Sequence, residues 1–133
     1  MFRYRLAIST SRGHMYGLPK DIDLSFFQTR ELQGVVFGLY QLQMQFDRSL
    51  LLSIEGRIEH TLQKSVTSWD QGKPPISASS LLTLLGLSVV SATGTEEGTL
   101  ILEFSNSDIV KVFESNEGYE SYQINYEGKL IIV

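Results

Sequence analysis

The sequence predicts a mainly β fold with one short helix (α+β), built as an antiparallel sheet or a small two-sheet sandwich. Apolar and polar residues alternate strictly from Tyr40 to Phe46, which is typical of a half-buried strand. A matching alternation recurs from Leu100 to Phe104, and one stretch with helical spacing lies between the two. We therefore expect two pseudo-repeated three-strand meanders, with about seven strands in all, joined by a helix.

Length and composition indicate one domain spanning residues 1–133, with an irregular segment at 1–17. The chain is 42% hydrophobic and 20% charged, which is ordinary for a folded protein. There is no cysteine, so disulfides and thiolate zinc sites are excluded. No apolar run is long enough for a membrane span, and the one after Met1 is too short for a signal peptide. These features predict a cytoplasmic protein that does not bind membranes.

The first repeat is expected at about 32–58. Its first strand is the β-rich run 35–37, and its second is the alternating segment 40–46. Residues 47–49 are turn formers, and the apolar run 50–54 then returns as the third strand.

A helix is expected at about 77–86, after a polar loop at 63–75 that ends in two prolines. Ser77 is placed as its N-cap, and Gly86 is placed to end it. A stripe of leucines would hold so short a helix by packing: Leu81, Leu82, Leu84 and Leu85.

The second repeat, about 87–113, matches the first at a spacing of 58 residues. The pattern L-x-L-x-F ending at Phe104 corresponds to L-x-M-x-F ending at Phe46, and the apolar residues that follow correspond as well. This match indicates an internal duplication. The chain is expected to close with a hairpin at 119–133.

Charge is distributed unevenly along the chain, whose formal net charge is −4. Residues 88–133 hold eight acidic residues against two lysines, whereas residues 1–31 are slightly basic. Phosphate binding needs clustered Lys and Arg, so we expect no direct nucleic-acid partner. The acidic third is compatible with a basic protein partner, or with a role in solubility alone.

A family resemblance rests on strand patterns in both repeats. They are segment 98–106 (GTLILEFSN), segment 119–124 (YESYQI) and, in the first repeat, segment 36–46 (VFGLYQLQMQF). These stretches resemble a small uncharacterised bacterial domain family with a duplicated three-strand repeat, although Tyr122 stands where that family typically has tryptophan. The resemblance covers most of 18–133 and implies a fold but no activity. By kind only, the chain also resembles immunity proteins of polymorphic and contact-dependent toxin systems.

No catalytic, metal-binding or cofactor-binding residue is predicted. His14 and His60 stand alone, with no histidine or glutamate at helical metal-ligand spacing. There is no Gly-x-Ser-x-Gly segment, and the turn 94–98 lacks the lysine and the following helix of a phosphate-binding loop. We expect a protein that is not an enzyme.

Four features are candidates for contact with a partner. One is the row of Gln41, Gln43 and Gln45 on one face of the predicted strand 40–46, which is either exposed, packed under a helix or part of an interface. Trp69 lies beside Asp70 in a polar loop, where it either anchors the loop to the core or is exposed as an interface aromatic. The acids of the turn 94–98 and the tyrosine-rich acidic segment after Phe113 are either solvated or part of a binding surface. The predicted partner-binding residues are Trp69, Asp70, Glu96, Glu97, Glu114, Glu117, Tyr119, Glu120 and Tyr122.

The leading hypothesis is a cytosolic immunity-type protein that neutralises a basic toxin domain by covering its active site. Acids and aromatics would give charge-steered association without turnover. Two alternatives stay open. One is a structural module whose open sheet edges pair with another copy, giving a homodimer. The other is a carrier of a small ligand.

Overall fold

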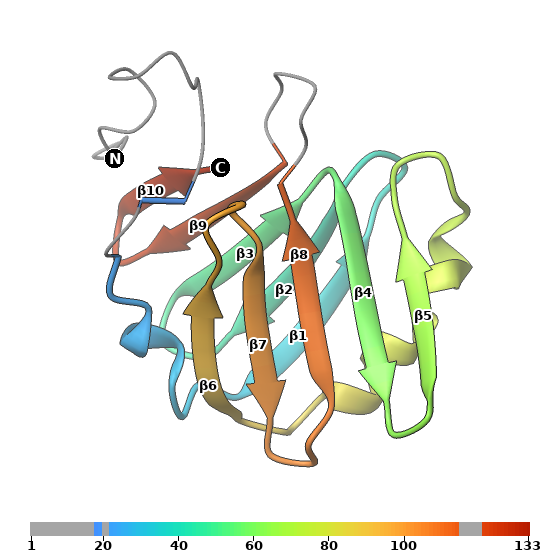
Figure 1. Cartoon of the computed structure of the whole chain (residues 1–133), viewed down its shortest axis with the longest axis horizontal. Coiled ribbons are helices and arrows are strands. Elements are labelled where there is room, and N and C mark those ends of the chain that lie inside the picture. The colour runs from blue at the N-terminus through green and yellow to red at the C-terminus, as the bar shows by residue number, and fades with distance from the viewer. Residues whose placement is uncertain (1–17, 20–21, 115–120) are drawn as a thin grey trace.

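The computed structural model describes residues 18–19, 22–114 and 121–133. Two antiparallel five-stranded sheets pack face to face, in the orders β1-β2-β3-β9-β10 and β5-β4-β8-β7-β6 (Figure 1). This confirms the predicted fold class, a mainly β chain with one helix and a two-sheet architecture. The segment 1–17, predicted to be irregular, and the first residues of the predicted closing hairpin lie outside the described residues.

The described chain contains one single-turn 3-10 segment, ten strands and one longer 3-10 helix. Their bounds are η1 Ser25–Phe27, β1 Leu32–Phe37, β2 Leu42–Phe46, β3 Leu50–Ile54, β4 Arg57–Leu62, β5 Ser65–Trp69, η2 Pro75–Leu84, β6 Val89–Gly94, β7 Leu100–Phe104, β8 Ile109–Phe113, β9 Tyr122–Tyr126 and β10 Lys129–Ile132. Neither of these two helical segments is long and apolar enough to cross a membrane.

Strands β1–β2–β3 and β6–β7–β8 form the two predicted meanders, one in each sheet. Phe46 lies opposite Leu32 in the first, and Phe104 lies opposite Val89 in the second. In both meanders the register shifts directly after this pair, which marks a bulge at the same place. The duplication predicted from the sequence therefore extends to the details of strand pairing.

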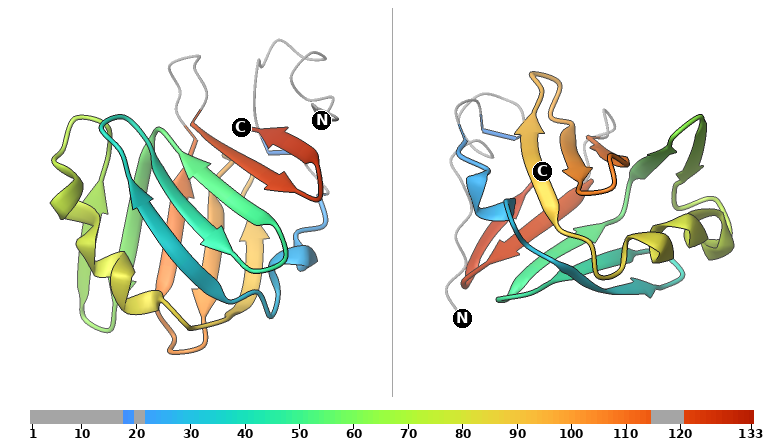
Figure 2. Two further views of the ribbon diagram at one scale, coloured as in Figure 1. Left: turned by 180° about the vertical axis from the view of Figure 1, so that it is seen from behind. Right: turned by 90° about the horizontal axis from the view of Figure 1, so that it is seen from below.

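Each meander is followed by a hairpin that joins the opposite sheet. Hairpin β4–β5 pairs through β4 with β8, and hairpin β9–β10 pairs through β9 with β3. Figure 2 shows the two sheets from behind and from below. The two halves of the chain are thus related by an approximate twofold axis, and each half completes the sheet of the other.

Near this axis, the segments that precede β1 and β6 hydrogen-bond to each other. The Thr29 amide donates to Val89 O, and the amide of its counterpart, Gly86, donates to Leu32 O. Thr29 and Gly86 both have positive φ, +67° and +84° respectively. The repeat relation therefore holds for single hydrogen bonds and for local backbone conformation.

The helix differs from the prediction in type and bounds. It is a 3-10 helix that begins at Pro75, so Ser77 is not its N-cap. Proline has no amide hydrogen to satisfy at the first helical position, which fits the lack of a capping side chain. Three buried residues follow the threefold period of a 3-10 helix: Ala78, Leu81 and Leu84. Gly86 lies just beyond the end, as predicted for a chain that must turn there.

The stretch predicted to be a loop contains strand β5, which pairs with β4 along its whole length. The described part of the chain therefore has ten strands rather than about seven. β5 is an edge strand whose first residues, Ser65 and Val66, are exposed and whose last, Trp69, is buried. A short edge strand with a mostly polar sequence carries little of the alternation that identified the other strands.

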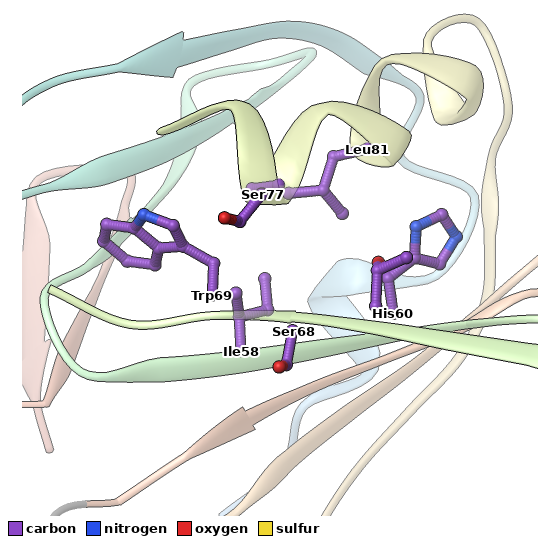
Figure 3. A pocket seen from close by; sticks show the side chains of 8 residues that line it. Ile58, His60, Ser68, Trp69, Ser77 and Leu81 are labelled. Carbon is purple, nitrogen blue, oxygen red and sulfur yellow. The ribbon is translucent and has the colours of Figure 1, made fainter. Parts of the chain in front are cut away.

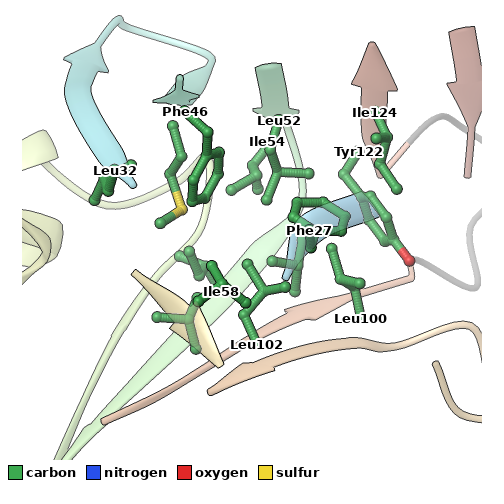
Figure 4. Close-up of a cluster of buried hydrophobic side chains, with 14 of the residues drawn as sticks. Phe27, Leu32, Phe46, Leu52, Ile54, Ile58, Leu100, Leu102, Tyr122 and Ile124 are labelled. Carbon is green, nitrogen blue, oxygen red and sulfur yellow. The ribbon is translucent and has the colours of Figure 1, made fainter. Parts of the chain in front are cut away.

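One continuous apolar core fills the space between the sheets (Figure 4). Equivalent positions of the two repeats supply it, such as Leu42 with Leu100 and Ile54 with Val112. Phe27, from the segment before β1, projects into the middle of this core and is fully buried. The core is therefore shared by both repeats and belongs to neither alone.

Candidate functional site

A buried polar cluster links η2 to one sheet. Its centre is His60 on β4, which is only 2% exposed. His60 Nδ1 is hydrogen-bonded to Ser80 Oγ on η2 at 2.8 Å, and Nε2 to Asp108 Oδ2, just before β8, at 2.8 Å. Ser80 Oγ is also hydrogen-bonded to Thr67 Oγ1 on β5 at 2.9 Å. Four side chains from four parts of the chain thus form one connected network.

His60 stands alone in the local sequence, as expected, but not in the folded chain. Its two partners lie 20 and 48 positions away in the sequence. Pairing across β4 and β8 and the covering by η2 create the cluster, so no local spacing could reveal it. His14, the other histidine considered, lies outside the described residues.

The approximate twofold axis shows that the fold does not require this cluster. The equivalent positions in the other half are buried and apolar: Ile124, Ile131 and Leu50 stand in place of His60, Thr67 and Asp108. The same arrangement of strands is therefore built with plain apolar contacts in one half. The polar network is a specialised feature of the other.

The cluster has the hydroxyl–imidazole–carboxylate order of serine enzymes, which invites a catalytic interpretation. However, the His60 imidazole is enclosed, and Ser80 Oγ is shared between His60 and Thr67. No buried side-chain nitrogen or oxygen of the described residues lacks a partner, so the cluster has no orphaned group facing a ligand. The observed contacts fasten η2 onto the β4–β5 hairpin.

A small hollow lies beside the cluster, between η2 and the β4–β5 hairpin. Figure 3 shows His60 and Trp69 at its two ends and Leu81 on the helix above. The free space is about 150 Å³ with the open mouth included. The hollow encloses no space large enough for a water molecule, whereas small-molecule sites usually take about 300–1,000 Å³. In the described parts of the chain, no group of three or more His, Asp or Glu side chains is arranged to hold a metal ion.

Trp69 and Asp70, both predicted to contact a partner, lie at the end of β5. Trp69 is 2% exposed and lies opposite Ile58, so it anchors the segment to the core. Of the two roles predicted for Trp69, the structure confirms the anchor to the core, so its side chain is not on a binding surface. Asp70 is partly exposed, and its Oδ1 accepts the Gly72 amide at 2.9 Å, which shapes the turn after β5.

Tyr122 is also buried, which corrects its assignment to a binding surface. Its hydroxyl donates to Gly98 O at 2.7 Å. Burial raises the pKa of Tyr122 far above its usual value, and the negative charge of Glu114 raises the pKa further. Tyr122 therefore ties β9 to the β6–β7 turn as a neutral side chain.

The acids of the β6–β7 turn do lie at the surface. Glu96 and Glu97 are exposed at the tip of the turn. Glu114, at the end of β8, lies against Gly98 of the same turn, because a Cβ placed on Gly98 would overlap its carboxylate. We call Glu96, Glu97 and Glu114 the acidic end. The other predicted residues, Glu117, Tyr119 and Glu120, lie outside the described residues.

The equivalent turn of the other half, between β1 and β2, is apolar. Leu39 and Tyr40 are 75% and 69% exposed there, and Ile76 at the start of η2 is 74% exposed. η2 contacts β1 and runs beside it (Figure 2, left), and Gln71 in the loop before η2 donates to Tyr40 O, so the elements that carry these residues adjoin on one side of the molecule. We call it the uncharged face, made of Val36, Leu39, Tyr40, Ile76, Leu82 and Leu85.

Sequence reasoning missed the uncharged face, although a signal was present. No charged residue occurs between Glu31 and Asp47 or between Lys73 and Glu96. These two segments supply β1, β2 and η2, and also β6. The apolar pattern of these segments predicts which side chains are buried. The absence of charged residues, in contrast, indicates that their exposed side chains form an uncharged surface.

Comparison with known proteins gives one match. The model of a family described as "Family of unknown function (DUF6188)" covers residues 23–133. This agrees with the resemblance to an uncharacterised domain family. Neither a curated protein nor a solved structure matches the chain.

Proposed function

We propose that this chain, which belongs to the family DUF6188, is a cytoplasmic protein-binding module of the immunity type. It neutralises a basic toxin domain by covering the active site of that domain, and it has no turnover of its own. The acidic end is the contact surface. The observation that carries the proposal is the grouping of Glu96, Glu97 and Glu114 at one end of the sandwich.

The twofold relation supports a role for these acids beyond folding. The β1–β2 turn has Leu39 and Tyr40 in the place of Glu96 and Glu97, so a turn at this position does not need carboxylates. Exposed acids add little to stability on their own. Their value lies in recognition of a positively charged surface.

A basic side chain near this end, Arg57 at the start of β4, is already engaged. Arg57 lies opposite Phe113, the residue before Glu114. Its guanidinium pairs with Glu59 at 2.7 Å and lies over the Phe113 ring at 5.0 Å. The field of the acidic end is therefore not cancelled by Arg57, and it would steer a cationic partner toward the β6–β7 turn.

A direct test uses the protein domains encoded beside the gene for this chain. A cationic toxin domain expressed in a bacterial host should stop growth, and co-expression of this chain should restore it. With purified proteins, the dissociation constant should rise several-fold with added salt, because exposed charges are screened within about 8 Å at physiological ionic strength. A neighbourhood without such a domain, or toxicity that the chain does not relieve, would contradict the proposal.

Matched charge variants test the surface itself. E96Q/E97Q/E114Q should weaken binding by about tenfold or more at low salt. The control D23N/E31Q/E127Q removes the same number of exposed acids elsewhere and should bind like the unmodified chain. Equal loss in both variants would show that net charge, rather than the acidic end, determines affinity.

A further inference from the structure

The uncharged face is the most unusual surface of the described chain. Leu39, Tyr40 and Ile76 each leave about seven-tenths of their surface in solvent. Large apolar side chains that are exposed together mark contact surfaces in folded proteins. Aromatic and aliphatic residues without charges are also the composition of interface centres.

The second half of the chain provides an internal control for this surface. Val36 on β1 corresponds to Thr93 on β6, and both are exposed. The exposed residues Leu82 and Leu85 correspond to Ser25 and Gln28, which are exposed as well. The same backbone positions are polar in one half and apolar in the other. The fold therefore does not require apolar side chains at these exposed positions.

The hairpin that carries Leu39 and Tyr40 is held in place. The Gly38 amide donates to Gln41 O at 2.8 Å across the turn. Gln71 Nε2, from the loop after β5, donates to Tyr40 O at 3.2 Å. On the other side, the polar cluster fastens η2 through Ser80. The face is therefore presented by anchored elements, which lowers the entropy lost on binding.

We propose that the uncharged face is a twofold contact between two copies of this chain. In such a contact the same patch meets itself, so every charge in it would face its own copy or a close neighbour. The molecule carries a net charge of −4, yet β1, β2 and η2 contribute no charge at all. This surface is thus suited to self-contact, whereas two acidic ends would repel each other.

Sedimentation velocity on the full chain over a wide concentration range tests the proposal. A dimer should form and should dissociate on dilution. Because no charge lies in the contact, high salt should leave the dimer intact, in contrast to binding at the acidic end. A monomer at every concentration, or a dimer that salt dissolves, would overturn the proposal.

Two substitutions and a control locate the contact. L39E/I76E should raise the dimer dissociation constant more than about tenfold, because both side chains would lie at its centre. V90E is the control, since Val90 on β6 is 48% exposed and lies outside the face; it should dimerise normally. Far-UV circular dichroism should be unchanged in both, because the altered residues are exposed. A dimer that survives L39E/I76E, or that V90E breaks equally, would place the contact elsewhere and refute the proposal.

Discussion

The rings of Phe46 and Phe104 stack on each other across the sandwich, with centroids 6.4 Å apart and planes inclined by 20°. The two residues hold the same position in their repeats, each opposite the residue where the bulge begins. A residue and its own counterpart therefore meet in the core, and they join the two sheets close to the approximate twofold axis.

This pair of rings should contribute more to the free energy of unfolding than two independent side chains would. F46L and F104L are each expected to lower the free energy of unfolding by about 1 kcal/mol, as for other apolar replacements of similar size. The double variant should lose less than the sum, with a coupling of about 0.5–1.5 kcal/mol from the ring contact. Urea unfolding of the four proteins measures this, and strict additivity would contradict the prediction.

The buried pair of His60 and Asp108 should be replaceable as a unit but not singly. D108L leaves His60 Nε2 without a partner, while Nδ1 keeps Ser80, and H60I leaves a buried carboxylate unpaired. Each is expected to cost about 2–5 kcal/mol of unfolding free energy. H60I/D108L installs the side chains of Ile124 and Leu50 and should recover most of that loss. Denaturant unfolding measures all three, and a double variant no more stable than the weaker single one would refute this expectation.

Tyr122 should make the protein sensitive to alkali. The pKa of Tyr122 is raised in the folded state, and its value in the unfolded chain is about 10. Below that pH both states keep the proton, so the stabilisation is complete. Above it only the unfolded state releases the proton, so the unfolding free energy falls as pH rises.

The variant Y122F isolates this effect. It loses the hydrogen bond to Gly98 O and should be less stable by about 1 kcal/mol at neutral pH. The difference in unfolding free energy between Y122F and the unmodified chain should shrink as pH rises above about 10. The reason is that Y122F has no hydroxyl at this position whose ionisation would favour the unfolded state. Y40F, which alters an exposed tyrosine, should follow the unmodified chain. A deficit that stays constant from neutral to alkaline pH would contradict the assignment.

Thr29 carries backbone strain that its counterpart Gly86 avoids. A β-branched residue at positive φ is unfavourable by about 1–2 kcal/mol, partly offset by the greater freedom of glycine in the unfolded chain. T29G should therefore stabilise by up to about 1 kcal/mol. G86T should destabilise, although no atom lies within 4 Å of a Cβ at that position. Thermal unfolding of both checks the signs, and matching signs would contradict the argument.

Ser80 should not behave as an enzyme nucleophile, because its hydroxyl is shared and the adjoining imidazole is enclosed. A fluorophosphonate probe incubated with the full chain is expected to leave its mass unchanged. Adduct formation that S80A abolishes would reverse this conclusion and identify the cluster as catalytic.

The sequence predicted the parts of the fold that follow from period-two alternation. Strand β2 alternates cleanly, and the same apolar positions recur in β7 at a spacing that revealed the duplication. β5 was missed because its exposed first residues and its single buried aromatic carry no alternation. The helix type was missed because the leucines fit an α-helical stripe as well as the threefold period that η2 adopts.

The candidate site was less accessible to sequence reasoning. Glu96 and Glu97 were placed correctly on the surface because they lie in a short turn between strands. His60, Ser80 and Asp108 come together only through the packing of η2 and the pairing of β4 with β8. The polar neighbours of Trp69 left its side chain undecided between core and surface, and those of Tyr122 suggested a surface position, whereas the structure buries both side chains.

The exchange of hairpins has a consequence for how the chain is made. When synthesis has reached Trp69, β4 and β5 exist, but β8, the neighbour on which β4 must lie, has not yet been translated. In the same way, β3 has no neighbour on its β9 side until β9 has been translated. One sheet cannot be completed before β8 has left the ribosome, and the other cannot be completed before β9 and β10 have done so. The nascent first half therefore exposes unsatisfied strand edges during that interval. Protection by a chaperone would matter most in that window.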